Sequence, residues 1–460
     1  MVNYPNSLRQ EIQAVTSLSA IFAFRMLGLF LILPIFAVAA LHYSHANPQL
    51  IGLGLGAYGL TQALLQIPFG LLSDRFGRKR IILLGLCLFA LGSLCAASAT
   101  SIYGLIFGRF LQGAGAIGST IMATLADLTK VENRTKAMAV IGLTVGISFS
   151  IAMILGPILY QAIGLSGIFI LTAGLALIGV AITLWAVPTP PQLLRQIDSK
   201  NLWQVIAVIL HNKELMRLNL GIFTSHALLT ACFTVLPTLL LQHQGFTLGA
   251  QWQFYLPILG GAFFAMVPFI IIAEKYHQTK LMLLLAITTL FLSLCALSLW
   301  HASLWQFAAS LFAFFTAFSF LEATLPSLVS KIAPAAHKGT TMGVFSSCQF
   351  LGIFCGGSAA GVVQTVWGMD SVFIFCAILS AIWLLLAFNM AKPAALQTRL
   401  IPLSTLDSAQ AHELTRRLNM ITGVVEAAIL LDDGIAYLKV NNTILDKSAL
   451  QSVTQTFVRD

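Results

Sequence analysis

The sequence predicts an all-α membrane protein of twelve spanning helices, arranged as two sets of six and followed by a small α+β domain. Three observations predict this fold class. Of the 460 residues, 58% are hydrophobic and only 9% are charged, whereas a soluble domain carries about 25% charged residues. Long apolar runs follow one another through most of the chain. This pattern ends after Lys392-Pro393, where the composition changes to that of a soluble segment.

Twelve apolar runs are each long enough to cross a bilayer, which requires about 20 helical residues. We expect spans over residues 17–41, 50–72, 80–98, 101–126, 137–162, 167–187, 218–241, 252–273, 280–300, 304–330, 340–365 and 369–391. A soluble core would not need so many runs of this length in series, so we expect a multi-pass membrane protein.

Basic residues gather in alternate connections between these runs. They occupy 73–80, 127–136 and 188–217, then the connections that carry Lys275 and Lys331, whereas the intervening connections contain neither lysine nor arginine. Because basic loops stay on the cytoplasmic side of a membrane, both termini are expected in the cytoplasm. The net charge of +9 then reflects loops beside an anionic lipid surface, and it gives no reason to expect a nucleic acid partner.

We expect four parts along the chain. An N-terminal six-helix bundle takes residues 1–190, and a cytoplasmic linker with an amphipathic helix takes 191–217. A C-terminal six-helix bundle takes 218–392, and a small cytoplasmic domain takes 398–460.

The last of these parts has the pattern of a ferredoxin-like domain. We expect a strand near Arg399–Leu403, a helix over Asp407–Met420, strands over Val424–Leu431 and Ile435–Val440, and a helix from Asp446 to Phe457. Asp432-Asp433-Gly434 is a hairpin turn signal between the two later strands. This β-α-β-β-α order lacks only the final strand of the fold. A unit of about 60 residues is marginally stable alone, so we expect it to dock on the transporter or to self-associate.

The connection between the second and third spans reads Gly70-Leu71-Leu72-Ser73-Asp74-Arg75-Phe76-Gly77-Arg78-Lys79-Arg80. This run resembles the signature G-x-L-[AS]-D-[RK]-x-G-R-[RK] of the major facilitator superfamily at every specified position. Ile106–Gly113 is similar to a second motif of the family, R-x-x-Q-G in span four. The resemblance implies the twelve-span fold of two six-helix bundles and a secondary transporter of the bacterial inner membrane.

A narrower resemblance is to the drug:proton antiporter branch of this superfamily, and within it to transporters that end in a ferredoxin-like (YAM) domain. It rests on Phe24–Gly28, Tyr58–Ala63, Asn133–Met138 and Leu325–Leu328, together with the C-terminal domain. It implies proton-coupled export of small amphipathic or hydrophobic compounds. Two alternatives stay open: proton-coupled uptake or exchange of a sugar or metabolite, and a membrane sensor that signals through the C-terminal domain.

The resemblance also implies a conformational latch in the charged connection. In the family, the residue that matches Asp74 meets the start of span eleven, here near Gly339, and so joins the two bundles. Arg78 is expected to pair with Asp127 at the end of span four. The residues assigned to the latch are Gly70, Asp74, Arg75, Gly77, Arg78 and Asp127. A simpler role of the basic residues is to set the topology, and the two roles are compatible.

Ionisable residues inside a span cost about 2.5–3.5 kcal/mol on insertion scales, so they usually have a role. Arg25, Arg109 and Glu322 are the clear cases. Arg109 shares a helical face with Gln112, and the family role of this arginine is proton transfer or positioning, with a structural tie as the alternative. Glu322 lies four residues before Pro326. We hypothesise that Glu322 carries the coupled proton, and helix packing is the alternative.

Other polar residues complete the expected central cavity. Tyr58, Gln62 and Gln66 share one stripe of span two, and His226 in span seven can titrate near neutral pH, although a lone histidine is often a packing residue. Gly146, Gly156 and Pro157 in span five resemble part of an antiporter motif without its later paired glycines. A generic seam of small residues is the alternative.

No enzyme constellation is present in the sequence. There is no P-loop lysine motif, and the seven cysteines lack metal-ligand spacing. We therefore expect neither catalysis nor a cofactor or metal. The expected partners are a small-molecule substrate, protons and the lipid bilayer.

Overall fold

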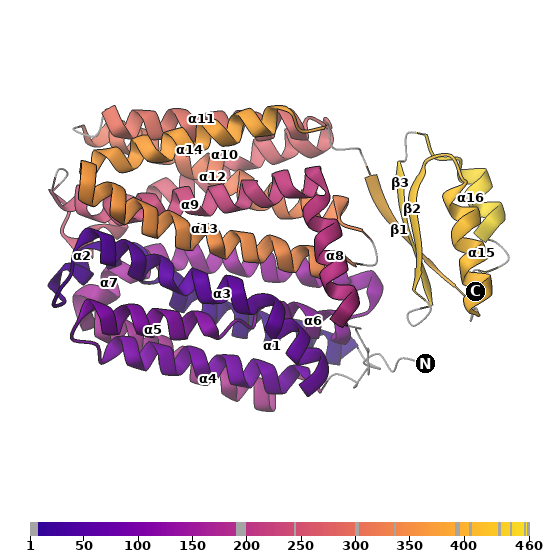
Figure 1. The fold of residues 1–460 in the computed structure, drawn as a ribbon, viewed down its shortest axis with the longest axis horizontal. Coiled ribbons are helices and arrows are strands. Elements are labelled where there is room, and N and C mark those ends of the chain that lie inside the picture. Colours follow the sequence, from indigo (N-terminus) through magenta and orange to yellow (C-terminus); the bar gives the residue numbers. More distant parts are fainter. Residues whose placement is uncertain are drawn as a thin grey trace.

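The computed structural model describes residues 8–189, 199–242, 245–299, 303–334, 337–391, 396–403, 407–430, 434–441, 444–454 and 457. Two helical bundles lie side by side, and a small domain of strands and helices lies at one end of them (Figure 1). We call the end of the bundles next to this C-terminal domain the domain end, and the opposite end the far end.

The first bundle contains seven helices by secondary structure. They are α1 (Leu8–Phe30), α2 (Phe36–Ala39), α3 (Pro48–Phe76), α4 (Arg78–Ala97), α5 (Ile102–Ala114), α6 (Gly118–Leu128) and α7 (Val131–Trp185). Span one thus begins at Leu8, nine residues before the start expected from hydropathy.

The second bundle follows an amphipathic helix. The helices are α8 (Ser199–His211), α9 (Lys213–Gln242), α10 (Trp252–Lys275), α11 (Thr279–Leu299), α12 (Leu304–Ile332), α13 (Lys338–Trp367) and α14 (Asp370–Phe388). The helix α8 lies at the domain end, across the ends of the bundle helices (Figure 1). The spanning helix α9 begins at Lys213, inside the stretch expected to be linker.

Within the described residues, 10 helices are long and apolar enough to cross a membrane. They account for eleven of the twelve expected spans, because one of them holds two, and the twelfth is span four, which α5 and α6 form together. The helix α7 has 55 residues, which is too long for one crossing of a hydrocarbon core of about 30 Å. Its backbone is non-helical at Gly164 (φ 65°, ψ −177°), a conformation that essentially only glycine adopts. Spans five and six therefore both lie in α7, and span four is divided into α5 and α6 at Gly115.

The two bundles meet backbone to backbone along α3 and α13 in the far half of the molecule. A Cβ on Gly56 would lie 2.8 Å from the carbonyl oxygen of Phe354, and one on Gly357 would lie 2.7 Å from that of Gly52. A Cβ on Gly59 would likewise clash with the carbonyl oxygen of Phe350. Only small residues permit such an approach of two helices, so these glycines close the far half of the interface.

The C-terminal domain has the order predicted for a ferredoxin-like unit. Its elements are β1 (Leu396–Pro402), α15 (Ser408–Asn419), β2 (Val424–Leu430), β3 (Ile435–Asn441) and α16 (Lys447–Thr454). The described strands pair antiparallel in the order β1-β3-β2. Asp407 caps α15 through a capping box with Gln410, which explains the predicted start. The expected turn residues Asp432 and Asp433 lie outside the described residues.

Candidate functional site

A network of polar side chains fills the interior of the first bundle. The Arg25 side chain on α1 is 2% exposed. Its Nη2 donates to the hydroxyl of Tyr58 at 2.6 Å and to the side-chain oxygen of Gln62. Gln62 in turn donates to Gln66 at 2.8 Å, one helical turn along α3. The expected stripe of span two is therefore a continuous hydrogen-bonded chain that starts at Arg25.

Arg109 belongs to a second branch of the same network. Its Nη1 donates to Gln112 at 2.8 Å, and Gln112 donates to Ser93 on α4 at 2.8 Å. The motif pairing of Arg109 with Gln112 is therefore present. Sequence reasoning did not find Ser93, because a serine in an apolar span carries no distinct signal.

Neutral groups hold both arginines. In the described part of the chain, neither Arg25 nor Arg109 forms an ion pair with a carboxylate. The guanidinium carbon of Arg25 lies 5.8 Å from the centroid of the Tyr58 ring, and that of Arg109 lies 5.2 Å from it. Because an arginine keeps its charge in proteins, neither residue can release and take up a proton during transport. The arrangement is suited to tying α1, α3, α4 and α5 together.

Glu322, His226 and Gln349 form a separate cluster in the second bundle. The Nε2 of Gln349 on α13 lies 2.8 Å from Nε2 of His226 on α9 and 3.3 Å from Oε1 of Glu322 on α12. The Nε2 of His226 lies 3.7 Å from Oε2 of Glu322. Glu322 and His226 were expected from sequence, whereas Gln349 was not. The expected central residues thus divide between two clusters, one in each bundle.

The hydrogen-bond pattern indicates the protonation state of this cluster. The Nδ1 of His226 lies 3.3 Å from the carbonyl oxygen of Ile222, so Nδ1 carries the hydrogen and Nε2 is the acceptor. Gln349 has two amide hydrogens, one for His226 and one for Glu322. The Glu322 side chain is 33% exposed, and its Oε2 has no hydrogen-bond partner among the described residues. In this arrangement Nε2 of His226 and Oε2 of Glu322 are both positions that can accept a proton.

The helix that carries Glu322 continues without a break through Pro326 to Ile332. Proline has no N–H, so the carbonyl of Glu322 lacks the usual donor four residues later. The helix therefore lacks one backbone hydrogen bond directly beside the carboxylate.

The charged connection forms a cluster around Arg78 at the domain end. Arg78 pairs with Asp74 at 2.5 Å and with Asp127 at 2.9 Å, and it donates to Ser73 at 2.7 Å. The expected Arg78–Asp127 pair is therefore present. Gly77 adopts φ 96° between α3 and α4, which lets the chain turn sharply there.

The other expected latch contacts differ in their placement. A Cβ on Gly70 would lie 3.3 Å from Oγ of Ser119, so α3 and α6 are close at that position. The Arg75 guanidinium lies 5.5 Å from the centroid of the neighbouring Phe76 ring. Among the described residues, no atom lies within 4 Å of a Cβ placed on Gly339. Packing at the start of α13, which the resemblance implies for Asp74, stays a prediction for a state with a closed domain end.

Comparison with known proteins decides the family. The profile of the Major Facilitator Superfamily matches residues 18–357 and 251–402. The chain belongs to the major facilitator superfamily. It is similar to the inner membrane transport protein YajR of Escherichia coli K12, with 40% identity over 443 residues, which cover 96% of this chain and 97% of YajR. It is a transporter and not an enzyme.

Two further likenesses are more limited. Multidrug resistance protein 2 of Bacillus subtilis is 34% identical over 134 residues, which cover 28% of this chain and 32% of that protein. The crystal structure of a bacterial homologue of the human lysosomal transporter Spinster, in an inward-facing and occupied conformation, superposes with a TM-score of 0.69 at 15% identity. That superposition covers 84% of this chain and 98% of that chain, and it shows the fold.

The antiporter-like seam of this transporter makes contact at one of its two glycines. A Cβ on Gly156 would lie 3.0 Å from Cγ of Pro34, and this glycine also lies against the carbonyl of Leu31. A Cβ on Gly146 would meet nothing within 4 Å. The neighbouring Pro157 lies inside α7. Gly156 therefore packs on the turn between α1 and α2, and Gly146 does not.

Two charged residues at helix ends were not predicted from the sequence. The buried Glu11 accepts hydrogen bonds from the backbone N–H of Lys130 at 3.0 Å and from Asn133 at 3.2 Å, at the start of α7. Lys79 donates to the carbonyl of Val187 at 2.9 Å, beyond the end of α7. Both charges have the sign that complements the helix dipole, and both tie α7 to its own bundle.

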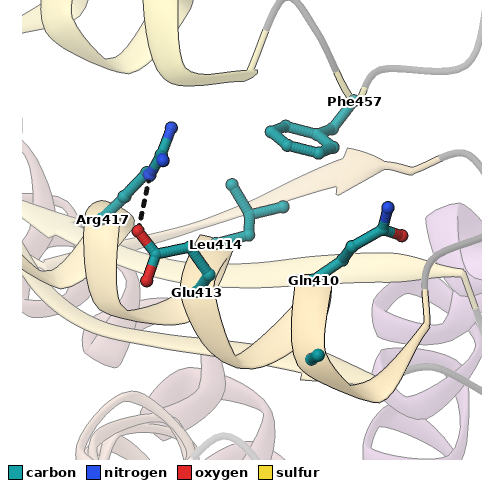
Figure 2. Close-up of a pocket in the computed structure, with 6 residues that line it drawn as sticks. Gln410, Glu413, Leu414, Arg417 and Phe457 are labelled. Atoms are coloured by element: carbon teal, nitrogen blue, oxygen red, sulfur yellow. Dashed lines mark hydrogen bonds and ion pairs between the residues drawn. The ribbon is translucent and has the colours of Figure 1, made fainter.

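A pocket on the C-terminal domain lies away from these clusters. It lies along α15 and under Phe457, as Figure 2 shows, and its lining residues are Ala409, Gln410, Glu413, Leu414, Arg417 and Phe457. Arg417 lies 2.8 Å from Glu413. Hydrogen bonds from Arg417 and Arg416 hold the pKa of Glu413 below its usual value. The pair is exposed, as expected of a solvated helix face.

Proposed function

We propose that this transporter works by alternating access and couples the export of small amphipathic or hydrophobic compounds to inward proton flow. The observation that carries the proposal is the cluster of Glu322, His226 and Gln349, which places a carboxylate and a histidine 3.7 Å apart inside a spanning bundle. Ionisable groups at such depth mark proton relays and substrate pathways in membrane proteins.

We assign the role of proton carrier to this cluster because its side chains can gain and lose a proton, whereas the buried arginines cannot. Arg25 and Arg109 keep their charge throughout a transport cycle. The Glu322 side chain is 33% exposed, and Nε2 of His226 lies 3.7 Å from its Oε2, which has no hydrogen-bond partner among the described residues. In this proposal, Arg25, Arg109 and their amide partners shape the first bundle, and the proton moves at the second.

Movement between two states is supported by the contacts between the bundles. The glycines of α3 and α13 close the far half of the interface, whereas no described atom packs against the Cβ position of Gly339 at the start of α13. In a major facilitator, two bundles rock about a site between them. We propose that the Arg78 cluster is the latch that closes the domain end when the far end opens.

The substrate class rests on two kinds of support. The spanning helices carry few charges, which suits an amphipathic or apolar compound better than a polyanion. Part of the chain resembles a protein named for multidrug resistance. Uptake of a sugar or metabolite and a pure sensor role are the outcomes that the transport experiment must separate from export.

The decisive experiment is transport by proteoliposomes that contain the full chain, with tetracycline and ethidium as the first probes. Export coupled to protons predicts accumulation in the compartment from which protons leave, and its loss in Glu322→Gln. Glu274→Gln is the matched control, because the Glu274 side chain is 66% exposed at the domain end. Accumulation in the same direction as proton flow would indicate uptake. Absence of any flux across a panel of amphipathic probes would favour the sensor.

We propose the bacterial inner membrane as the location, with the domain end and both termini in the cytoplasm. The support is the basic side chains at that end, which include Arg75, Arg78 and Lys79, and the positive-inside rule. A green fluorescent protein fused after Asp460 should fluoresce, and alkaline phosphatase fused there should be inactive. The reverse pattern would overturn the orientation.

We also propose that the C-terminal domain docks on the transporter rather than on a second copy. Lys439 on β3 is 6% exposed, and it donates to the carbonyls of Ile332 at 3.2 Å and Ala333 at the end of α12. Its Nζ also pairs with Glu426 at 2.9 Å. A cation at a helix C-terminus satisfies free carbonyls and complements the dipole. Lys439→Met should increase hydrogen exchange at residues 329–334, whereas Arg416→Met on the exposed face of α15 should not.

A further inference from the structure

Gln349 lies where the two halves of the transporter meet. Its side chain contacts the Glu322–His226 pair in the second bundle. The next residue, Phe350, faces the first bundle, with its ring centroid 6.1 Å from that of Tyr58. The carbonyl of Phe350 lies against Gly59 of α3. Two consecutive residues of α13 therefore join the proposed proton site to the interface between the bundles.

One proton is enough to disrupt the hydrogen bonds of Gln349. The Nε2 of His226 has a single lone pair, and in this structure it accepts from Gln349. A proton on that nitrogen turns it into a donor, which can pair only with an acceptor such as Oε2 of Glu322, 3.7 Å away. A proton on Oε2 instead makes the carboxyl a donor to the same nitrogen. In either case the proton takes the position that the Gln349 hydrogen occupies.

We propose that Gln349 is a positioning residue that transmits protonation of the Glu322–His226 pair to the contact between α3 and α13. This inference rests on the proposed function, because it assumes that the pair takes up a proton. When the proton binds, the hydrogen bond from Gln349 to His226 breaks and a hydrogen bond between His226 and Glu322 forms. The bond that holds this turn of α13 to α9 is then lost.

The contact between α3 and α13 is so close that a small movement of α13 changes it. A Cβ on Gly56 would already lie 2.9 Å from Cα of Phe354, one turn beyond Phe350. Packed interfaces of this kind move between discrete arrangements rather than deforming smoothly. Protonation therefore favours release of α3 from α13 and opening of the far end, and loss of the proton restores the closed arrangement seen here.

Other titratable groups near α13 do not explain such a response. Tyr58 is the titratable side chain of α3 next to Phe350, and Arg25 and Arg109 behind it keep their charge. On α13 itself, Lys338 is the first residue, and the thiols of Cys348 and Cys355 lie one residue before and six residues after Gln349. The other charged or histidine side chains described on helices that contact α13 lie within five residues of a helix end: Asp74, Arg75, Asp127, His211, Lys213, Glu214, Arg217, Lys331 and Asp370.

The test is hydrogen–deuterium exchange of the full chain in lipid nanodiscs at about pH 8 and about pH 5, the range over which a histidine changes its charge. Labelling times are corrected for the intrinsic pH dependence of amide exchange, with α11 as the internal reference. Acidification should increase exchange in residues 346–358 of α13 and 52–60 of α3. Gln349→Ala should exchange fast at both pH values, so that the response to pH is lost.

Matched variants separate this inference from the proposed function. Gln364→Ala removes a glutamine from the same helix near the far end and should keep the wild-type response. Glu322→Gln should lose the response together with pH-driven transport. A wild-type response in Gln349→Ala would overturn the role of Gln349, even if Glu322→Gln abolishes coupling. Retention of both the response and pH-driven transport in Glu322→Gln would overturn the proposed proton site itself.

Discussion

The guanidinium of Arg109 lies 5.2 Å from the centroid of the Tyr58 ring, so a tyrosine of span two holds the arginine of the span-four motif. The hydroxyl of the same ring accepts a hydrogen bond from Arg25. One aromatic side chain therefore stabilises two buried cations, through its face and through its oxygen. This relationship is one contribution to the burial of two arginines that form no ion pair with a carboxylate among the described residues.

Replacement of Tyr58 should separate these two contributions. Tyr58→Phe keeps the ring and removes the hydroxyl that accepts from Arg25. We expect this to lower the free energy of unfolding by about 1.5–3 kcal/mol, which is typical of a hydrogen bond to a charged group. Tyr58→Leu also removes both ring contacts, each worth about 0.5–2 kcal/mol. The measurement is unfolding in detergent, with Tyr103→Phe, which is 59% exposed, as the control. Equal losses in the Phe and Leu variants would contradict the role of the ring.

The Arg78 cluster should show measurable but modest coupling. The side chains of Arg78 and Asp127 are 14% and 16% exposed, so their ion pair is screened less than a surface pair. We expect a double-mutant cycle of Arg78→Ala and Asp127→Ala to give a coupling energy of about 1 kcal/mol in unfolding free energy. The exposed pair of Arg416 and Glu413, with side chains 67% and 43% exposed, should show weaker coupling. Equal coupling in the two cycles would mean that burial adds nothing to the Arg78 cluster.

The glycine contacts between α3 and α13 predict a sharp difference between two similar substitutions. Gly56→Ala places a methyl group 2.8 Å from the carbonyl oxygen of Phe354, and overpacking of this kind costs about 1–3 kcal/mol. Gly260→Ala in α10 meets nothing within 4 Å, so it should be neutral or stabilise by up to about 1 kcal/mol through helix propensity. Thermal unfolding and hydrogen exchange of α13 measure both effects. Similar behaviour of the two variants would argue against close contact at Gly56.

The last helix of the C-terminal domain should depend on pH through its cap. The backbone N–H of Ala449 and the hydroxyl of Ser448 donate to Asp446 at 2.9 and 2.6 Å, and these bonds hold the pKa of Asp446 below its usual value. The unfolded chain therefore binds the proton more tightly. The stabilisation is present above the ordinary pKa of aspartate, about 3.9, and is lost as the pH falls through the lower folded pKa.

Hydrogen exchange of α16 in the full chain tests this cap. Acidification below about pH 4, where aspartate takes up its proton, should remove protection of α16 in the wild-type chain. Asp446→Asn should give weaker protection at neutral pH and no such change on acidification. Protection that is independent of pH in the wild-type chain would show that the cap does not stabilise α16.

Much of the architecture could be predicted because its causes are local. The length of each apolar run predicts a span, and the helical periodicity from Asp407 predicts α15. Asp446 predicts the start of α16, because a capping side chain bonds to N–H groups two or three residues away. The cost of a charge in a membrane identified Glu322, Arg25 and Arg109 without any knowledge of their partners. The pairing of Arg78 with Asp127 was expected from the family resemblance and not from a local pattern.

The rest required the folded chain. Gln349 meets His226 and Glu322 across 123 and 27 residues of sequence, and nothing in a helix rich in small residues marks that glutamine from the others. The division of span four at Gly115 and the buried position of Lys439 also depend on neighbours distant in the sequence. Hydropathy and capping follow from each segment alone, so the sequence determined which segments cross the membrane. The partners of each buried polar group depend on how helices pack, and only the tertiary structure decided those.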